Sequence, residues 1–87
     1  MSYKIVFTKN AVKDYELVKK SPYAQKVKKL LLIIEQDPFK PPYEPLVGNM
    51  QGLYSRRINK EHRLVYEVNK ETHEIKIRAM WTHYERS

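Results

Sequence analysis

The sequence predicts a small α+β domain in which two N-terminal helices pack on one face of a mainly antiparallel four-stranded sheet. Segments 3–7, 53–68 and 74–82 are rich in β-branched and aromatic residues, as half-buried strands are. Between them, residues 8–37 repeat their apolar side chains at helical spacing. The expected order is therefore β-α-α-β-β-β, and 87 residues are expected to form one domain spanning 1–87.

The first helix is predicted directly after the first strand, residues 3–7 (YKIVF). Thr8 has a side-chain oxygen of the kind that caps a helix N-terminus. From there to about Lys20, apolar residues fall on one face at a spacing of about 3.6 residues. These residues are Ala11, Val12, Tyr15 and Val18.

A second helix is predicted from Ser21 to Asp37. Ser is a favoured N-cap, and Pro22 suits the first helical position. Asp37 precedes a proline, which disfavours helical backbone angles and ends the helix. Its apolar stripe consists of Tyr23, Val27, Leu30, Leu31 and Ile34, whereas Lys26, Lys28 and Lys29 are expected to form a solvated face.

An arginine-rich β-hairpin is predicted over residues 52–66, GLYSRRINKEHRLVY. With Asn59-Lys60 as a two-residue turn, Arg56 would stand directly opposite Arg63. Burying unpaired cations is costly, so the arginines are expected to face solvent, an acidic partner or a phosphate. Both a solvated outer face and a phosphate cradle fit this pattern, and arginine suits the second because its planar fork grips two phosphate oxygens.

The remaining segments add a loop and a last strand. Residues 38–52 are rich in Pro, Gly and Asn and predict a loop, in which Glu44 by itself is an ordinary surface carboxylate. A turn is expected at 69–72 before the strand 74–82, whose apolar residues Ile75, Ile77, Ala79 and Trp81 alternate with Lys76, Arg78 and Met80.

The composition narrows the function classes. A formal charge of +7 and a pI of about 9.7 indicate nucleic acid as the first expected partner, with a membrane surface or an acidic protein as alternatives. The chain has no cysteine, and its three histidines do not show the spacing of a zinc site, so no metal or other cofactor is expected. No apolar run is long enough for a signal or a membrane span, and we expect a cytoplasmic protein.

Four motifs together resemble the YoeB/Txe branch of the RelE-type toxins, which are ribosome-dependent mRNA endonucleases of bacterial type II toxin–antitoxin pairs. In chain order they are DPF (37–39), PYEPL (42–46), GLYSRRINKEHRLVY (52–66) and THY (82–84). The resemblance spans nearly the whole chain and implies the RelE-like small nuclease fold. Two departures stand out: Val47 replaces a frequent lysine, and residues 85–87 follow the His-Tyr pair.

Matched by position, the resemblance implies a catalytic set and an RNA-binding set. The catalytic set is Glu44, Arg63, His83 and Tyr84, and the RNA-binding set is Arg56, Arg57 and Glu61. In the implied reaction Glu44 is the general base for the RNA 2′-hydroxyl and His83 is the general acid. Arg63 stabilises the charge on the phosphorane, and Tyr84 stacks on a base or positions the phosphate.

The resemblance also implies partners. These are mRNA, the A site of the small ribosomal subunit, an acidic antitoxin of the YefM/Axe type, and operator DNA only through the antitoxin complex. Two other classes stay open: a non-catalytic basic module that binds RNA or DNA, and an antitoxin co-repressor that acts through protein contacts alone. The endonuclease is favoured because the positions of both the base and the acid are filled.

Overall fold

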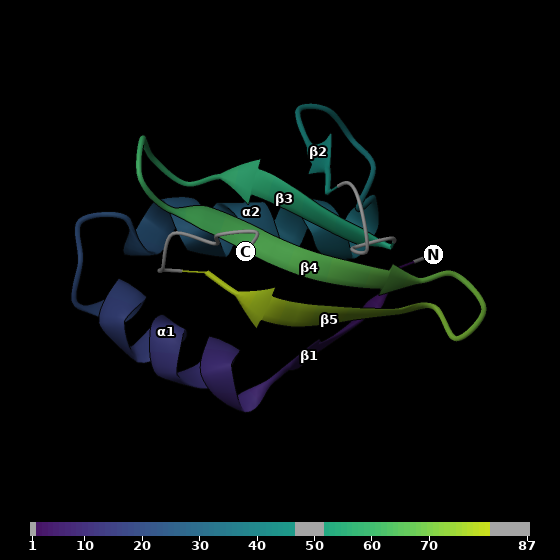
Figure 1. Ribbon diagram of the computed structural model, residues 1–87, viewed down its shortest axis with the longest axis horizontal. Helices are drawn as coiled ribbons and strands as arrows, with labels where there is room; N and C mark the ends of the chain where they lie inside the picture. Colours follow the sequence, from purple (N-terminus) through teal and green to yellow (C-terminus); the bar gives the residue numbers. More distant parts are fainter. Residues whose placement is uncertain (1, 47–51, 81–87) are drawn as a thin grey trace.

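A computed structural model describes residues 2–46 and 52–80 and confirms the α+β fold (Figure 1). The elements are β1 (Lys4–Phe7), α1 (Lys9–Lys19), α2 (Ala24–Gln36), β2 (Glu44–Pro45), β3 (Leu53–Arg57), β4 (Arg63–Asn69) and β5 (Glu74–Ala79). The sheet order is β1-β5-β4-β3-β2, with β1 parallel to β5 and the other pairs antiparallel. The sheet thus has one strand more than predicted, the two-residue β2 at its edge. No helix in the described ranges is long and apolar enough to cross a membrane.

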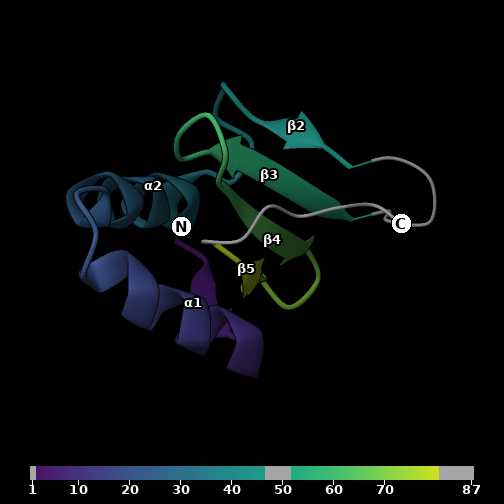
Figure 2. The same ribbon diagram turned by 60° about the vertical axis from the view of Figure 1, so that its left-hand side comes forward.

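Both helices lie on the same side of the sheet (Figure 2). The core fills the space between these two layers, and all of its central side chains are fully buried. The helices contribute Ala11, Val18, Val27 and Ile34, and the sheet contributes Leu64, Tyr66, Ile75 and Ile77. The predicted core face of β4 is therefore confirmed. On the opposite face, the sheet presents charged side chains of β2, β3 and β4, with the buried Ser55 and Val65 between them.

The start of α1 is as predicted. The Thr8 hydroxyl oxygen accepts a hydrogen bond from the backbone N–H of Ala11 at 3.1 Å, which satisfies one of the free donors at the helix N-terminus. Further along, the buried Asp14 accepts a hydrogen bond from the backbone N–H of Met80 at 3.1 Å. This bond ties α1 to the end of β5.

The start of α2 differs from the prediction. Ser21 is not its N-cap: the Ser21 hydroxyl donates to the Val18 carbonyl at 2.8 Å and accepts from the Tyr23 N–H at 3.1 Å. The serine therefore closes the end of α1, and α2 begins three residues later at Ala24. Its end is as predicted, because Asp37 before the proline has an extended backbone.

The β3–β4 connection also differs from the predicted two-residue turn. It contains five residues, 58–62, and is closed by a hydrogen bond from the Ile58 N–H to the His62 carbonyl at 2.9 Å. The Asn59 side chain replaces backbone partners in this loop, because its Oδ1 accepts from the N–H groups of Glu61 and His62 at 2.7 and 2.8 Å. The observed register pairs Arg56 with Leu64 and Arg57 with Arg63. It is shifted by one residue from the predicted one.

The β4–β5 turn and the alternation of β5 are confirmed up to Ala79, whereas Met80, predicted to alternate with the buried residues, is itself fully buried in the core. Asn69 Oδ1 accepts from the N–H groups of Glu71 and Thr72, and the odd-numbered residues of β5 are buried while Lys76 and Arg78 are exposed. A bulge opposite Val65 and Tyr66 places Arg78 between two paired positions. The predicted contribution of Trp81 lies outside the described residues.

Candidate active site

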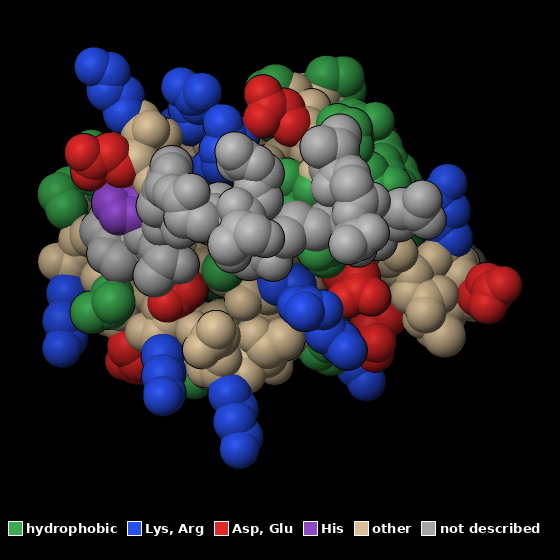
Figure 3. All heavy atoms as spheres, viewed as in Figure 1, with side chains coloured by type: hydrophobic (Ala, Val, Ile, Leu, Met, Phe, Trp, Pro, Cys, Tyr) green, Lys and Arg blue, Asp and Glu red, His purple; other side chains and the backbone are tan. Residues whose placement is uncertain are grey.

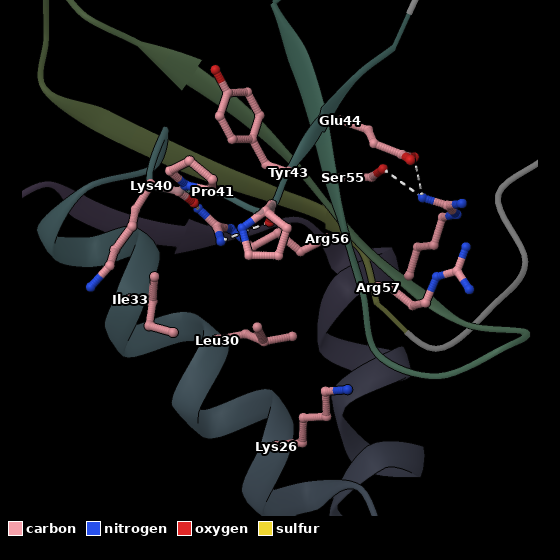
Figure 4. A pocket seen from close by; sticks show the side chains of 12 residues that line it. Lys26, Leu30, Ile33, Lys40, Pro41, Tyr43, Glu44, Ser55, Arg56 and Arg57 are labelled. Atoms are coloured by element: carbon pink, nitrogen blue, oxygen red, sulfur yellow. Dashed lines mark hydrogen bonds and ion pairs between the residues drawn. The ribbon is translucent and has the colours of Figure 1, made fainter.

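Three side chains from three neighbouring strands meet on the sheet face that the helices leave open. Glu44 in β2 pairs with Ser55 in β3, and Ser55 pairs with a residue of β4 two positions after Arg63. Because residues two apart share a face, all three point the same way. An Arg63 guanidinium nitrogen, Nη1, donates to Glu44 Oε1 at 2.7 Å and to Ser55 Oγ at 3.2 Å (Figure 4).

The structure therefore brings together two of the predicted catalytic residues that are 19 positions apart in sequence. The prediction that Glu44 lies in a loop is wrong, since it forms the short strand β2. That pairing is what fixes the direction of its side chain toward Arg63. Ser55, which completes the group, was not singled out from the sequence, and its place inside the SRR motif was the available signal.

The Glu44–Arg63 pair is accessible to solvent. The Glu44 side chain is 65% exposed and that of Arg63 is 29% exposed. An exposed ion pair contributes about 0–1 kcal/mol to stability. The fold therefore does not depend on this contact, and the two groups are free to exchange it for contacts with a ligand.

A second cation lies beside the pair. Arg57 is exposed and stands directly opposite Arg63 in the β3–β4 ladder. Like charges in this position repel each other by up to about 1 kcal/mol, and the Glu44 carboxylate offsets part of that repulsion. Lys and Arg side chains gather near this end of β3 (Figure 3), so the surroundings of the pair attract anions.

Arg56 does not belong to this open face, contrary to the prediction that it faces solvent, an acidic partner or a phosphate. It is 3% exposed. The physical reason is the hairpin register: a shift of one residue moves a side chain to the other face of the sheet. In the observed register Arg56 shares the face of the buried Leu64, on the side of the helices.

The Arg56 guanidinium is held by neutral oxygens. Its Nη1 donates to the Pro42 carbonyl at 3.0 Å, and its Nη2 donates to the carbonyls of Pro38 and Lys40 at 3.2 and 2.5 Å. Its Nε donates to the Tyr66 hydroxyl at 3.2 Å, which in turn donates to the Pro38 carbonyl at 2.7 Å. Arg56 thus fastens the segment 38–42, which leads directly into Glu44.

An aromatic cluster on the same face of β3 as Arg56 also supports this segment. Phe39 and Tyr43 contact Tyr54 with ring centroids 5.1 and 5.8 Å apart, in edge-to-face geometry. The Tyr54 ring also contacts the Tyr66 ring, with the two ring centroids 6.0 Å apart. Such contacts add about 0.5–1.5 kcal/mol per pair beyond buried area. The segment before Glu44 is therefore fixed by packing as well as by hydrogen bonds.

A cleft of about 490 Å³ opens next to the ion pair, between α2 and β3 (Figure 4). Glu44, Ser55 and Arg63 line it on the side of the sheet. Its other lining residues are Lys26, Leu30 and Ile33 of α2, the segment Lys40–Tyr43, and Arg56 and Arg57 of β3. The cleft is therefore continuous with the candidate site.

The other predicted site residues are not part of this group. Glu61 lies in the β3–β4 loop, where it lines a separate hollow with Pro22 and Tyr23. His83, Tyr84 and the departure at Val47 lie outside the described residues. Within 2–46 and 52–80, no three His, Asp or Glu side chains lie close enough together to hold a metal ion.

Comparison with known proteins gives consistent matches along the chain. The family described as "YoeB-like toxin of bacterial type II toxin-antitoxin system" matches residues 7–84. A Toxin YoeB from Synechocystis is 41% identical over 71 residues, which cover 75% of this chain and 80% of that protein. A Toxin YoeB from Escherichia coli is 40% identical over 62 residues, covering 69% of this chain and 71% of that protein.

Solved structures agree with the sequence matches. A YoeB/ParE toxin from Agrobacterium tumefaciens has a TM-score of 0.84 and 33% identity, covering 93% of this chain and 99% of its own. A YoeB dimer from Staphylococcus aureus has a TM-score of 0.81 and 35% identity, covering 97% and 100%. A YoeB–YefM complex from the same organism matches with a TM-score of 0.78, 35% identity and the same coverage.

Proposed function

This chain belongs to the YoeB-like toxin family and is the toxin of a bacterial type II toxin–antitoxin system, and from this premise we propose that it is an mRNA endonuclease that acts on the ribosome. The observation that carries the proposal is the Glu44–Arg63 pair, a carboxylate and a guanidinium 2.7 Å apart on an exposed, cationic sheet face. The proposed site of action is the A site of the small ribosomal subunit, in the cytoplasm.

RNA can be cut by its own 2′-hydroxyl, which attacks the adjacent phosphorus while the 5′-oxygen of the next nucleotide leaves. In our proposal a Glu44 carboxylate oxygen takes the proton of the 2′-hydroxyl. Arg63 moves its hydrogen bonds to the phosphorane oxygens as their negative charge develops. The products are a cyclic 2′,3′-phosphate and a 5′-hydroxyl, and no bond to the protein forms.

The remaining roles rest on the family motifs. His83 gives a proton to the leaving 5′-oxygen, and Tyr84 stacks on a base or positions the phosphate. Arg57 binds RNA phosphate beside Arg63, which its exposure and its place opposite Arg63 support. Arg56 supports RNA binding indirectly, because it is buried and holds the segment before Glu44. Glu61 takes part in RNA binding from the β3–β4 loop.

We also propose that an acidic antitoxin of the YefM type binds and silences the toxin. The YefM-bound relative from S. aureus supports this partner. The formal charge of +7 favours association with an acidic segment, since opposite potentials steer encounter and suppress wrong partners. Contact with operator DNA is expected only through this complex.

The test is primer-extension mapping of an mRNA incubated with purified protein, with and without ribosomes. Glu44→Gln removes the base and keeps the shape, and cleavage should fall about 10²–10⁴-fold. The structure offers a matched control: Glu67 and Arg78 form a second ion pair on the same sheet face, at 2.8 Å and with both side chains 42% exposed. Glu67→Gln should retain cleavage within about twofold.

Each outcome of this experiment supports or contradicts a named part of the proposal. Cuts that require ribosomes, are lost in Glu44→Gln and survive in Glu67→Gln support the proposal. Cuts by the wild type without ribosomes contradict the requirement for the ribosome. A folded wild type that makes no cuts under either condition contradicts the endonuclease, and equal loss in both variants contradicts the assignment of Glu44 as the base.

A further inference from the structure

We propose that the cleft between α2 and β3 is a second nucleotide site, which holds the nucleotide adjacent to the scissile phosphate. Lys26 and Arg57 bind the phosphate of this nucleotide, and the apolar wall formed by Leu30, Ile33 and Pro42 receives its base. The inference rests on the proposed function, because it assigns the neighbouring part of the same RNA substrate.

The position of the cleft supports this assignment. Glu44, Ser55 and Arg63 line its rim on the side of the sheet. A strand of RNA whose scissile phosphate lies on Arg63 has the cleft directly beside it, because Arg63 itself lines the cleft. Because the surface runs without interruption from the reaction site into the cleft, a neighbouring nucleotide enters without any movement of the backbone.

The chemistry of the lining fits a nucleotide. Lys26 on α2 and Arg57 on β3 are both exposed and line the cleft from its two walls (Figure 4). Among the described lining residues the single carboxylate is Glu44, and its charge is already paired with Arg63. A phosphate in the cleft therefore meets two exposed cations and no unpaired carboxylate among the described lining residues, while the base meets aliphatic and proline side chains.

The size of the cleft favours a nucleotide over a helix of a protein partner. Its volume is about 490 Å³. One turn of an α-helix, with a diameter of ~11 Å and a pitch of 5.4 Å, occupies roughly 500 Å³. The cleft is thus about as large as one helical turn, whereas a helix that binds in a groove places its apolar anchors along about two turns.

The wall of the cleft is also preorganised. The carbonyls of Lys40 and Pro42, which flank the wall, are fixed by the Arg56 guanidinium at 2.5 and 3.0 Å. On the α2 part of the wall, Leu30 packs against the buried core. A site whose walls are already held loses less entropy when it takes up a ligand.

The first test measures binding of a single-stranded RNA oligonucleotide carrying 2′-O-methyl groups throughout, so that it cannot be cut. Lys26→Gln should weaken its affinity about three- to tenfold and reduce the slope of log K against log salt by about 0.7, the loss of one phosphate contact. Lys29→Gln is the matched control. It removes the same charge from the same helix, but Lys29 does not line the cleft. It should change the affinity less than twofold.

A second measurement tests the apolar wall by the methyl NMR signals of α2. On addition of a 2′-O-methyl trinucleotide, the methyl groups of Leu30 and Ile33 should shift, while those of Leu32, which is 63% exposed and lines a different groove, should not. Equal effects of Lys26→Gln and Lys29→Gln, or unchanged Leu30 and Ile33 signals, would overturn the site. So would a Lys26→Gln variant that binds RNA normally but has lost affinity for an acidic antitoxin segment.

These results are independent of the endonuclease proposal. The oligonucleotide cannot react, so binding to the cleft is measured whether or not the protein is a nuclease. A wild type that cuts mRNA while Lys26→Gln binds normally refutes only the second site. A wild type that does not cut refutes the endonuclease, and the two binding measurements still decide the cleft.

Discussion

Arg56 gives the sharpest test of how the structure holds its candidate site. We consider Arg56→Met, which keeps much of the aliphatic volume and removes all four hydrogen bonds of the guanidinium. The Pro38 carbonyl retains a donor, because the Tyr66 hydroxyl contacts it at 2.7 Å. The carbonyls of Lys40 and Pro42 lose theirs.

The magnitude follows from these two carbonyls. A buried acceptor left without a partner costs about 1–3 kcal/mol, and because both bonds are partly buried, the lower half of that range applies to each. Replacing the cation by methionine also removes the cost of burying a charge, which offsets part of the loss. We expect Arg56→Met to lower the free energy of unfolding by about 2–3 kcal/mol, a large share of the 5–15 kcal/mol typical of a domain.

The assay is urea unfolding followed by far-ultraviolet circular dichroism. With a denaturant slope of about 1–1.5 kcal/mol/M, the expected loss lowers the urea midpoint by about 2 M. The matched control is Arg57→Met, one residue along the same strand, where an exposed side chain should change stability by no more than about 0.5 kcal/mol. Arg56→Lys, which keeps the charge but not the fork, should fall between the two.

Equal midpoints for Arg56→Met and Arg57→Met would refute this reasoning. That result would mean that the segment 38–42 is held without the guanidinium. The register that separates the two neighbouring arginines would then have no energetic consequence.

Two further predictions concern Tyr66 and Thr8. Burial raises the pKa of Tyr66 above its ordinary value of 10.0, and the Arg56 cation opposes that rise. Because the folded pKa is the higher one, Tyr66 has no effect on the pH dependence of stability below about pH 10. Above that pH the unfolded state loses its proton first, and the free energy of unfolding falls as the pH rises toward the folded pKa. Unfolding free energies measured at pH 8 and pH 10.5 should therefore fall more for the wild type than for Tyr66→Phe, and parallel losses would contradict the assignment. Thr8→Ala should cost about 1 kcal/mol in urea unfolding, because the cap on the Ala11 N–H is lost. Thr8→Ser keeps the hydroxyl and should cost less than half as much, and equal costs would show that the loss is not one of capping.

Sequence patterns predicted the parts of the fold that local physics decides. Thr8 caps α1 because its side chain reaches an N–H only three residues away. Pro38 ends α2, because a proline keeps the residue before it, Asp37, out of the helical conformation, and this effect involves only two adjacent residues. The alternation of Leu64 and Tyr66 with Arg63, Val65 and Glu67 predicted which face of β4 packs against the helices, since period-2 geometry needs no tertiary information. The motifs that carry the family resemblance also stand in the sequence, including the two residues that meet at 2.7 Å, Glu44 and Arg63.

Tertiary structure decided what depends on register and on distant partners. The five-residue β3–β4 loop rests on side-chain hydrogen bonds of Asn59, and its length moved Arg56 to the opposite face from the one predicted. No local pattern tells two adjacent arginines apart, because their difference lies in carbonyls 14–18 residues earlier in the chain. The two-residue strand at Glu44 likewise exists only through its pairing with Tyr54 and Ser55 of β3. The sequence by itself determined which motifs hold the candidate site residues, and only the packed structure determined that Arg57 faces the solvent while Arg56 holds the segment before Glu44.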